Sequence, residues 1–493
     1  MLERNTPDEL SSDKLELKLF RQSPLGTRIS DEIQNPFTTR EILLRKKSQA
    51  YRIHKEKEKL KNTVNKTYAY EIESHPTRTV RMPAVRIFHS KPKKRQDLDF
   101  EVASTNEIQE NIDFTFPEIC EVFWTRQETN GWKPEARQQA TLTLSQNKLY
   151  LIGGVSKRIN SEINLFSPAY KRWERTETIG AESEPRFGHS SVEYQQKIII
   201  FGGGTDFNQV HKLRECLNGV KSLNTETKEI SNLKCIGSYI NTRKQHCYAL
   251  IGKHMFIQGG MNQKNNLLDD SALLNLNKNH WQVLNIKGQG PGYCALHAAA
   301  VVLSPEQKLI KSIFKLPPTK KKFPNCGIYV FGGLNGNKEA SGNLFLLKIG
   351  SKNLQWTLPD TLGQPPSPRF SHSMNYNEKL EILIIFGGRI DSASSGNYTC
   401  YNDVFILRVK DLTWVTVKVL GNVPSTRSGH CTACYGSKVY MFGGISTSSY
   451  CGSHLYFLEL NPKSARTLIE DEERRKAKEL EIEILKAKRV EFT

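Results

Sequence analysis

An apolar run that ends in two glycines recurs six times in this sequence of 493 residues, and this repetition limits the possible folds more than any other feature. Each run has the length of one β-strand, and self-similarity of this kind indicates stacked repeats. We therefore expect a repeat protein built from small β-sheets. The runs are LYLIGG (149–154), IIIFGG (198–203), MFIQGG (255–260), IYVFGG (328–333), LIIFGG (383–388) and VYMFGG (439–444).

Arginine and histidine precede the glycine pairs at regular distances. The step from histidine to the first glycine is 13 residues in three repeats and 15 in the fifth. In the fourth repeat the step is 35, because a segment rich in lysine and proline, residues 304–325, is added. We expect this segment to be a surface insertion between two strands. The positions are Arg137, Arg186 and His189, Arg243 and His246, His297, Arg369 and His372, and Arg427 and His430.

A tryptophan stands 13 residues before most of the arginine positions, as Trp414 does before Arg427. The same step back from Arg137 reaches Trp124. The last repeat has an apolar third strand, residues 454–460, and no tryptophan after it. A four-stranded sheet cannot bury both of its faces alone, but a ring of such sheets can. We therefore expect a ring of six sheets, in which an N-terminal strand near Trp124 completes the last one.

Together these features resemble the kelch repeat over about residues 118–462. The resemblance implies an all-β fold, a six-bladed kelch-type β-propeller, whose loops on one face commonly grip protein partners. No BTB or F-box sequence is evident, so a role as a ubiquitin-ligase adaptor has no support beyond the propeller itself. The repeats depart from the family pattern where Ala140 replaces histidine, Ile230 replaces tryptophan and Cys294 replaces arginine.

Residues 1–117 have few apolar clusters, and we expect them to form an extended basic arm rather than a packed domain. Residues 40–95 contain 17 lysines and arginines against five aspartates and glutamates. Thr39 is suited to cap a helix over 40–61, and the segment Lys91–Arg95 resembles a nuclear-import signal. The basic side chains expected to anchor the arm are Arg45, Lys46, Lys47, Lys93, Lys94 and Arg95.

Residues 463–493 have the composition and periodicity of a helix. Its apolar stripe covers barely two heptads, which is short for a free coiled coil. We expect it to pack against the propeller or a partner. The stripe consists of Ala477, Leu480, Ile484 and Ala487.

No catalytic motif is present, and we expect no enzyme activity, cofactor or metal. The sequence lacks a phosphate-binding Gly-x-x-x-x-Gly-Lys, a Gly-x-Ser-x-Gly and a His-Glu-x-x-His. The recurring histidines follow the repeat and are better explained as structural hydrogen-bonding groups than as metal ligands. Cys431 and Cys434 lie three residues apart in an expected strand, so their side chains point to opposite faces and do not suit a shared metal.

The polar start of the sequence lacks the apolar core of a secretory signal. No stretch approaches the roughly 18 consecutive apolar residues of a membrane span. The ten scattered cysteines are therefore expected to be reduced thiols in the cytosol or nucleus.

The loops after the second and fourth strands of each expected blade open on one face, and two of them are long. Arginine and tyrosine are favoured anchors at protein interfaces, so we expect a protein partner to bind there. The candidate residues are His211, Lys212 and Arg214 in one loop, Arg389, Asp391, Tyr398 and Tyr401 in another, and Tyr450 in a third.

The net charge of +19 favours acidic partners. We therefore expect a non-enzymatic scaffold in the cytoplasm, the cytoskeleton or a cilium. Its propeller would hold one protein while the basic arm binds an acidic protein surface, such as tubulin in a microtubule. One alternative is a nuclear, chromatin-associated protein whose arm meets nucleic acid. Another is a metal-dependent enzyme with a site built from distant loops.

Overall fold

The computed structural model describes residues 119–209, 213–304, 325–349, 354–391, 397–447 and 449–461, and parts of the segment 467–482. The chain divides into two units, Met1–Asn111 and Ile112–Thr493, and all described residues belong to the second. The expected arm, with its helix over 40–61 and its basic residues 45–47 and 93–95, lies outside the described residues. His211 and Lys212 lie outside them as well.

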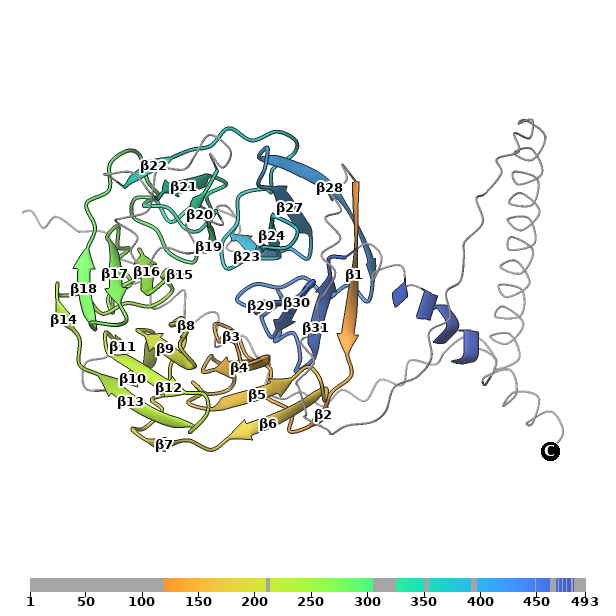
Figure 1. Cartoon of the computed structure of the whole chain (residues 1–493), viewed down its shortest axis with the longest axis horizontal. Helices are drawn as coiled ribbons and strands as arrows, with labels where there is room; N and C mark the ends of the chain where they lie inside the picture. Colours follow the sequence, from red (N-terminus) through yellow and green to blue (C-terminus); the bar gives the residue numbers. More distant parts are fainter. Residues whose placement is uncertain are drawn as a thin grey trace, which may run out of the picture. The chain divides into compact units, whose positions relative to one another are not determined.

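Four-stranded antiparallel sheets surround a central axis and are called blades 1 to 6 in the order of their inner strands (Figure 1). The prediction of a β-propeller is confirmed, and the described residues are mostly in β-strands. Blade 1 consists of β3 (Thr141–Ser145), β4 (Lys148–Ile152), β5 (Ile163–Ser167) and β6 (Arg172–Thr176). Blade 2 consists of β8 (Ser190–Tyr194), β9 (Lys197–Phe201), β12 (Val220–Asn224) and β13 (Glu229–Leu233).

The remaining blades have the same order of strands, from the axis outward. Blade 3 consists of β15 (Cys247–Ile251), β16 (His254–Gln258), β17 (Ser271–Asn275) and β18 (His280–Val283). Blade 4 consists of β19 (Ala298–Val302), β20 (Gly327–Phe331), β21 (Leu344–Lys348) and β22 (Gln355–Thr357). Blade 5 consists of β23 (Ser373–Asn377), β24 (Ile382–Phe386), β27 (Val404–Arg408) and β28 (Thr413–Gly421). Blade 6 consists of β29 (Cys431–Tyr435), β30 (Lys438–Phe442), β31 (Leu455–Glu459) and β1 (Ile119–Gln127).

The second strand of each blade is apolar along most of its length because neighbouring blades cover both of its faces. All five residues of β20 are buried, for example. Apolar clusters fill the spaces between neighbouring blades, including the space between blades 6 and 1. There Trp173 of blade 1 meets Phe442 of blade 6, at a ring-centroid distance of 5.6 Å. Burial of this apolar area is the main favourable contribution to folding.

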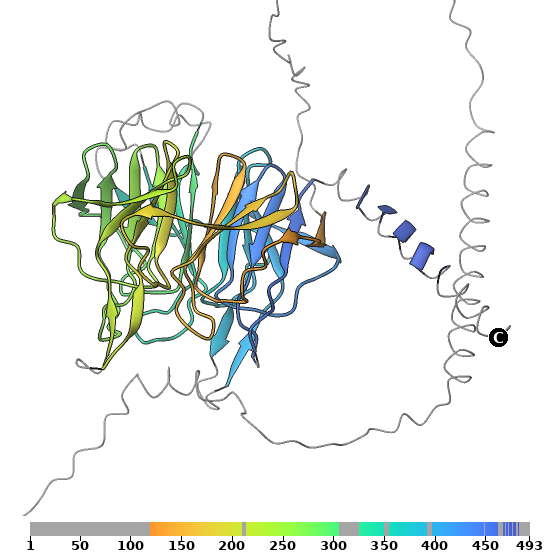
Figure 2. The same cartoon turned by 90° about the horizontal axis from the view of Figure 1, so that it is seen from below.

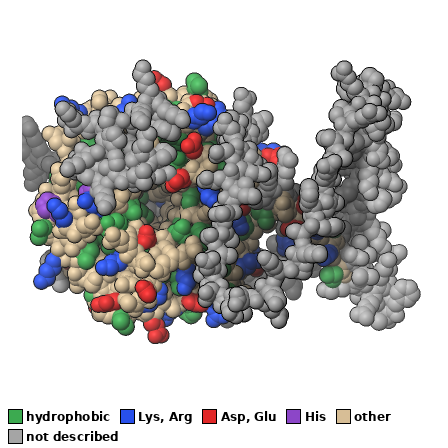
Figure 3. Space-filling model, viewed as in Figure 1, with side chains coloured by type: hydrophobic (Ala, Val, Ile, Leu, Met, Phe, Trp, Pro, Cys, Tyr) green, Lys and Arg blue, Asp and Glu red, His purple; other side chains and the backbone are tan. Residues whose placement is uncertain are grey.

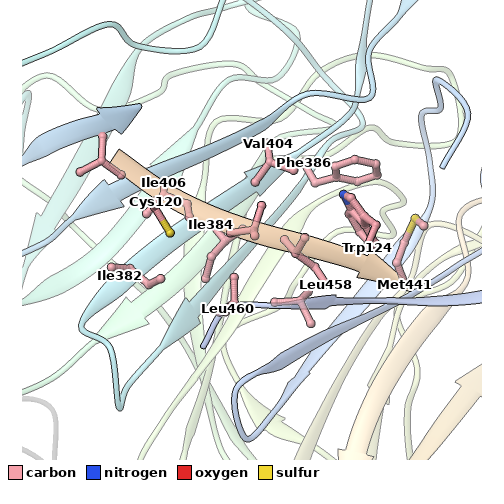
Figure 4. Close-up of a cluster of buried hydrophobic side chains, with 13 residues drawn as sticks. Cys120, Trp124, Ile382, Ile384, Phe386, Val404, Ile406, Met441, Leu458 and Leu460 are labelled. Atoms are coloured by element: carbon pink, nitrogen blue, oxygen red, sulfur yellow. The ribbon is translucent and has the colours of Figure 1, made fainter. Parts of the chain in front are cut away.

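β1 comes from the other end of the chain and lies on the outer edge of blade 6 (Figure 1). It pairs antiparallel with β31, where Trp124 is opposite Leu458, and parallel with β28, where Trp124 is opposite Gly421. Figure 4 shows the side chains around it, in which the Trp124 ring lies 4.9 Å from that of Phe386 and beside Met441. β1 therefore joins the strands of blades 5 and 6 into one continuous sheet.

A short segment after each outer strand runs along the outer strand of the next blade. β2 (Asn130–Gly131) pairs in this way with β6, β7 (Ile179–Gly180) with β13, and β14 (Ile236–Gly237) with β18. Each segment has a glycine with positive φ, seven residues after the tryptophan position. At Gly421 an added Cβ would lie 2.3 Å from the carbonyl oxygen of Trp124, so only glycine fits. The glycines are Gly131, Gly180, Gly237, Gly288, Gly363 and Gly421.

A ring of backbone hydrogen bonds connects the inner strands at one end of the axis. The residue before each histidine position has a φ between 55° and 65°. Its amide donates to the carbonyl of its counterpart in the preceding blade, with N–O distances of 2.6 to 2.9 Å, and the amide of blade 1 donates to blade 6. The ring is therefore continuous through all the blades. Its members are Gln139, Gly188, Gln245, Leu296, Ser371 and Gly429.

Described residues between 467 and 482 are helical. Leu468 packs against the apolar cluster between blades 6 and 1, whereas Ala477 and Ile482 are exposed. The rest of the predicted stripe, residues 480, 484 and 487, lies outside the described residues. In the part of the chain that the structure describes, no helix is long and apolar enough to span a membrane.

Candidate interaction face

One face of the propeller carries the loops after the second and fourth strands, and we call it the hairpin face. Two of these loops form hairpins, β10 (Gly204–Asn208) with β11 (Leu213–Cys216) in blade 2, and β25 (Arg389–Asp391) with β26 (Tyr398–Cys400) in blade 5. Figure 2 shows β25 and β26 extending beyond the body of the propeller. Blades 2 and 5 are three blades apart, so the hairpins stand on opposite sides of the axis (Figure 1).

The hairpin of blade 5 is held by stacked aromatic and guanidinium groups. The Arg389 guanidinium carbon lies 4.9 Å from the ring centre of Phe370 and 4.7 Å from that of Tyr398. The Tyr398 hydroxyl donates a hydrogen bond to the carbonyl oxygen of Ser446 in blade 6, at 3.0 Å. Asp391 lies 3.3 Å from Arg389 Nε, and burial raises its pKa while Arg389 opposes this rise. These contacts fix the hairpin against the next blade.

The hairpin of blade 2 has a similar support. The Arg214 guanidinium carbon lies 5.9 Å from the ring centre of Phe187, and Lys244 Nζ lies 5.6 Å from the same ring. Asn208 Nδ2 donates a hydrogen bond to Glu215 Oε1 across the hairpin, at 2.6 Å. A phenylalanine directly after the arginine occurs only in the repeats of blades 2 and 5, at positions 187 and 370. This Arg-Phe-x-His pattern is a sequence signal for the hairpins.

The other two predicted site residues support the loops from within. The Tyr401 ring centre lies 4.4 Å from the guanidinium carbon of buried Arg369. The Tyr450 hydroxyl donates a hydrogen bond to the carbonyl oxygen of Ser156 in blade 1, at 2.8 Å, and burial raises its pKa. The structure thus places Arg389, Tyr398, Tyr401 and Tyr450 in packed positions. Their predicted role in binding a partner stays a prediction.

Three exposed aromatic side chains on the hairpin face were not among the predicted site residues. Phe207 in β10 is 44% exposed, Tyr239 in the loop after β13 is 76% exposed, and Tyr293 in the loop after β18 is 56% exposed. Large aromatic groups that remain in water on rigid loops are typical of protein interfaces. In the sequence, these three residues were marked only by their positions in the loops after the second and fourth strands, which were expected to open on one face.

Buried arginines join these loops to the glycine pairs and form what we call the arginine layer. In each member Nη1 donates to the carbonyl of the first glycine, at 2.8 to 3.2 Å, and Nε donates to the carbonyl two residues earlier. Most members also meet a carboxylate, as Arg243 does with Asp270 at 2.6 Å. The layer fixes the loops at the base of the hairpin face. Its members are Arg137, Arg186, Arg243, Arg369 and Arg427.

The buried histidines connect neighbouring inner strands. His246 Nε2 lies 2.9 Å from the hydroxyl of Ser190, the residue that follows the histidine of the preceding blade. His189 and His430 pair in the same way with Thr141 and Ser373. The structural role predicted for the histidines is therefore confirmed for these three. Among the described residues there is no group of three side chains that could hold a metal ion.

The other two histidines lack such a hydroxyl partner. His297 Nε2 lies 3.8 Å from Cys294 Sγ, and the residue of blade 4 that corresponds to the partner of His372 is Ala298, so neither ring nitrogen of His372 has a side-chain partner among the described residues. Replacing Ala298 by serine is expected to raise the free energy of unfolding by about 0.5–1.5 kcal/mol, the contribution of one hydrogen bond. The reverse change, Ser190→Ala, is expected to lower it by about 1–3 kcal/mol, because it leaves a buried imidazole unpaired. Chemical denaturation measures both, and changes of the same sign would contradict this pairing.

The buried histidines also make stability depend on pH. Burial lowers the pKa of His189 and of His430 to about 3, and that of His297 to about 4. In the unfolded chain a histidine binds its proton near pH 6.5. Acid therefore favours the unfolded state, and the free energy of unfolding is expected to fall as the pH drops from about 6.5 toward 4.

The expected slope is up to about 1.4 kcal/mol per pH unit for each such histidine. Denaturation at about pH 7 and about pH 5.5 separates this effect from that of carboxylates, which titrate mostly below this range. His430→Gln should reduce the slope, because it removes one of the histidines whose pKa burial lowers. Equal stability at the two pH values would contradict the prediction.

The inner strands surround a cavity of about 520 Å³ on the axis. Its lining mixes apolar residues with paired polar groups, such as Thr432, whose hydroxyl lies 2.7 Å from Asn375 Oδ1. Among the described residues that line it, Glu193 is the only carboxylate, and none is a lysine or an arginine. Cys431 and Cys434 face different blades, and burial raises the pKa of both thiols to about 12.

Residues 104–310 and 324–479 match the family model described as the KLHDC2/KLHL20/DRC7 Kelch-repeats domain. Among curated proteins, Acyl-CoA-binding domain-containing protein 4 of Arabidopsis thaliana is 26% identical over 319 residues, which are 62% of this chain and 42% of that protein. Host cell factor of Drosophila melanogaster is 26% identical over 290 residues, 55% of this chain and 17% of that protein.

A further relative is the Leucine-zipper-like transcriptional regulator 1 homolog of Drosophila melanogaster, 24% identical over 373 residues, 73% of this chain and 35% of that protein. This chain thus spans less than half of the length of these relatives. Among solved structures, "Structure of YjhT" has 13% identity and a TM-score of 0.49, covering 64% of this chain and 93% of that one.

Kelch propellers are typically protein-binding modules, and the family model covers well over half of this chain. The repeated glycine pairs, the arginine layer and the histidines that join neighbouring strands agree with that match. The chain therefore belongs to the kelch-repeat family, of the KLHDC2/KLHL20/DRC7 type.

Proposed function

We propose that this protein is a non-enzymatic scaffold, built on a six-bladed propeller that β1 closes, whose hairpin face binds a protein partner. Two observations support the closure. β1 is hydrogen-bonded on both edges, to β28 and to β31. The ring of backbone hydrogen bonds around the axis returns from blade 6 to blade 1. A closed ring keeps the loops of different blades at fixed distances, which lowers the ordering cost of binding.

The single observation that carries the binding role is the exposure of Phe207, Tyr239 and Tyr293 on fixed loops of one face. Their aromatic rings offer apolar area without a large loss of side-chain freedom on binding. Figure 3 shows the face of the propeller opposite the hairpin face, where basic and acidic side chains are interspersed over the described surface.

The test compares two variants of the full chain in cross-linking pull-downs from cells. A triple variant, Phe207→Ser, Tyr239→Ser and Tyr293→Ser, is expected to lose the proteins that the wild type captures. The control is Tyr170→Ser, in the turn between β5 and β6 at the opposite end of the strands, where the side chain is 77% exposed. Equal capture by all three proteins would overturn the role of this face.

The basic arm supports the second half of the proposal. Residues 40–95 hold 17 basic and five acidic side chains, and such a segment binds acidic surfaces. We propose that it anchors the propeller to an acidic protein surface such as that of a microtubule, which would place the protein in the cytoskeleton or a cilium. Co-sedimentation with microtubules should decrease when residues 1–117 are removed. Unchanged sedimentation, or binding to DNA with a steep salt dependence instead, would remove this half of the proposal.

A further inference from the structure

The arginine layer comes with a matching acidic position, the residue directly before the third strand of each blade. In blade 3 this residue is Asp270, whose two oxygens lie 2.9 and 2.6 Å from the guanidinium of Arg243. In blade 5 it is Asp403, at 2.6 and 2.9 Å from that of Arg369. In blade 1 it is Glu162, beside Arg137. The buried cation and the carboxylate thus form one repeated unit.

Two departures show that this pairing is maintained. In blade 2 the acidic position is Gly219, and Glu184, two residues before Arg186, supplies the carboxylate instead, at 2.7 Å. In blade 4 both members are lost together, since Cys294 stands at the arginine position and Asn343 at the acidic one. A buried charge without a counter-charge is costly, which explains why the two members change together.

Blade 6 keeps the arginine and lacks the acid. Arg427 is 1% exposed, and the acidic position is occupied by His454. Its Nη1 donates to the carbonyl oxygen of Gly443, and Nε and Nη2 donate to the carbonyl and hydroxyl oxygens of Ser425. In the part of the chain that the structure describes, no carboxylate lies within ion-pair distance of Arg427.

Blade 5 is the closest internal reference for this site. Arg369 makes the same bonds, to the carbonyl oxygen of Gly387 and to the carbonyl and hydroxyl oxygens of Ser367. It has Asp403 in addition, whose side chain is 38% exposed although that of Arg369 is fully buried. The carboxylate position therefore lies at the surface and can be reached from solvent. Blade 6 has the same guanidinium site without that carboxylate.

The surroundings of Arg427 favour an anion. The ring centre of Tyr456 lies 5.4 Å from the guanidinium carbon. Burial lowers the pKa of Arg427. Burial also lowers the pKa of His454, and the positive charges of Arg126, Lys133 and Arg427 lower it further, whereas Glu128 raises it. Cys451 and His454 lie in the loop before β31, and burial raises the pKa of the Cys451 thiol and lowers that of His454, which favours the neutral form of each.

We infer that the Arg427 site binds a carboxylate from an acidic segment of a protein partner, in the position that Asp403 occupies in blade 5. The chelating geometry of Asp270 and Asp403 shows which group fits, a planar carboxylate that accepts two hydrogen bonds. Arg126 and Lys133 favour further acidic residues of the same segment. The inference rests on the proposed role as a protein-binding module and names one subsite on the hairpin face.

The test introduces a carboxylate of the chain itself beside Arg427. His454→Asp places a carboxylate where blades 3 and 5 have one, and it should raise the melting temperature because it pairs a buried cation. Binding of a labelled hexaglutamate peptide to the full chain, followed by fluorescence anisotropy, should weaken about tenfold or more in this variant. The charge control is Ser449→Asp, at an exposed position of the same loop, which should leave binding within about twofold of the wild type.

The reciprocal variant, Asp270→Asn, removes the carboxylate from blade 3 and should lower the melting temperature and add hexaglutamate binding. Equal binding by the wild type and His454→Asp, or equal weakening by His454→Asp and Ser449→Asp, would overturn the inference. Binding of inorganic phosphate with no binding of hexaglutamate would overturn it as well. The Phe207, Tyr239 and Tyr293 variant tests the proposed function separately, because it leaves Arg427 unchanged.

Discussion

Replacing Trp124 by alanine is expected to lower the free energy of unfolding by about 3–5 kcal/mol, the cost of removing a large aromatic side chain from a packed core. Trp124 is 1% exposed and lies in the cluster shared by blades 5 and 6, against Phe386. The loss should be larger than the area alone suggests, because β1 comes from the other end of the chain and holds the outer edge of blade 6. Chemical denaturation followed by intrinsic fluorescence and by circular dichroism measures it.

The control for this change is Trp132→Ala, nearby in the sequence but 44% exposed. The guanidinium carbon of Arg175 lies 5.9 Å from its ring centre. We expect a change of about 1 kcal/mol or less. Similar losses for the two tryptophans would contradict the placement of Trp124 in the core.

Replacing Arg243 by methionine is expected to lower the free energy of unfolding by about 3–5 kcal/mol. The guanidinium is fully buried and donates to Asp270 and to the carbonyl oxygens of Gly259 and Asn241. The change leaves these acceptors without partners and removes the connection between the loop and the glycine pair. Methionine retains most of the side-chain volume, so the loss reports the polar contacts rather than a cavity.

The matched control is Arg408→Met. Arg408 and Asp411 also come within 2.6 Å, but their side chains are 21% and 43% exposed. Water screens this pair, and its removal is expected to cost about 0–1 kcal/mol. Comparable losses at the two sites would mean that the arginine layer is a surface feature rather than a buried one.

The spacing of the repeat was sufficient to predict a kelch propeller. A step of 13 residues from tryptophan to arginine led from Arg137 back to Trp124, and the structure places Trp124 opposite Leu458 of β31. The same periodicity holds a second signal, the glycine seven residues after each tryptophan position, which also identifies Ile230 as the equivalent residue of blade 2. Periodic positions are predictable because the same position in every blade has the same backbone conformation and the same packing neighbours.

Departures from the repeat were harder to predict because they depend on contacts between blades. The missing partner of His372 is caused by Ala298, a residue of the preceding blade that no pattern within blade 5 reveals. Tyr401 and Tyr450 occur in loops and were expected to bind a partner, and the structure adds that Tyr401 packs against Arg369 and Tyr450 bonds to Ser156. A loop residue with an aromatic ring can serve either role, and only its neighbours in space decide which.

The exposed aromatic residues of the hairpin face illustrate the same limit. Tyr239 and Tyr293 stand in short loops, where length gave no reason to single them out. Arg214 and Arg389 stand in long ones and were singled out, but each guanidinium lies over a phenylalanine of its own blade. Loop length therefore singled out the two loops that form hairpins, and the role of their side chains in binding a partner stays a prediction.

Hydrogen–deuterium exchange of residues 119–127 tests the central claim, that a strand from the start of the chain seals the ring from which the hairpin face projects. β1 has bonded neighbours on both edges, so its amides should exchange as slowly as those of β30 in the middle of the same blade. Exchange of this segment at the rate of an unstructured peptide, while β30 stays protected, would show that the ring is open and that the hairpin face lacks the rigid support described for it.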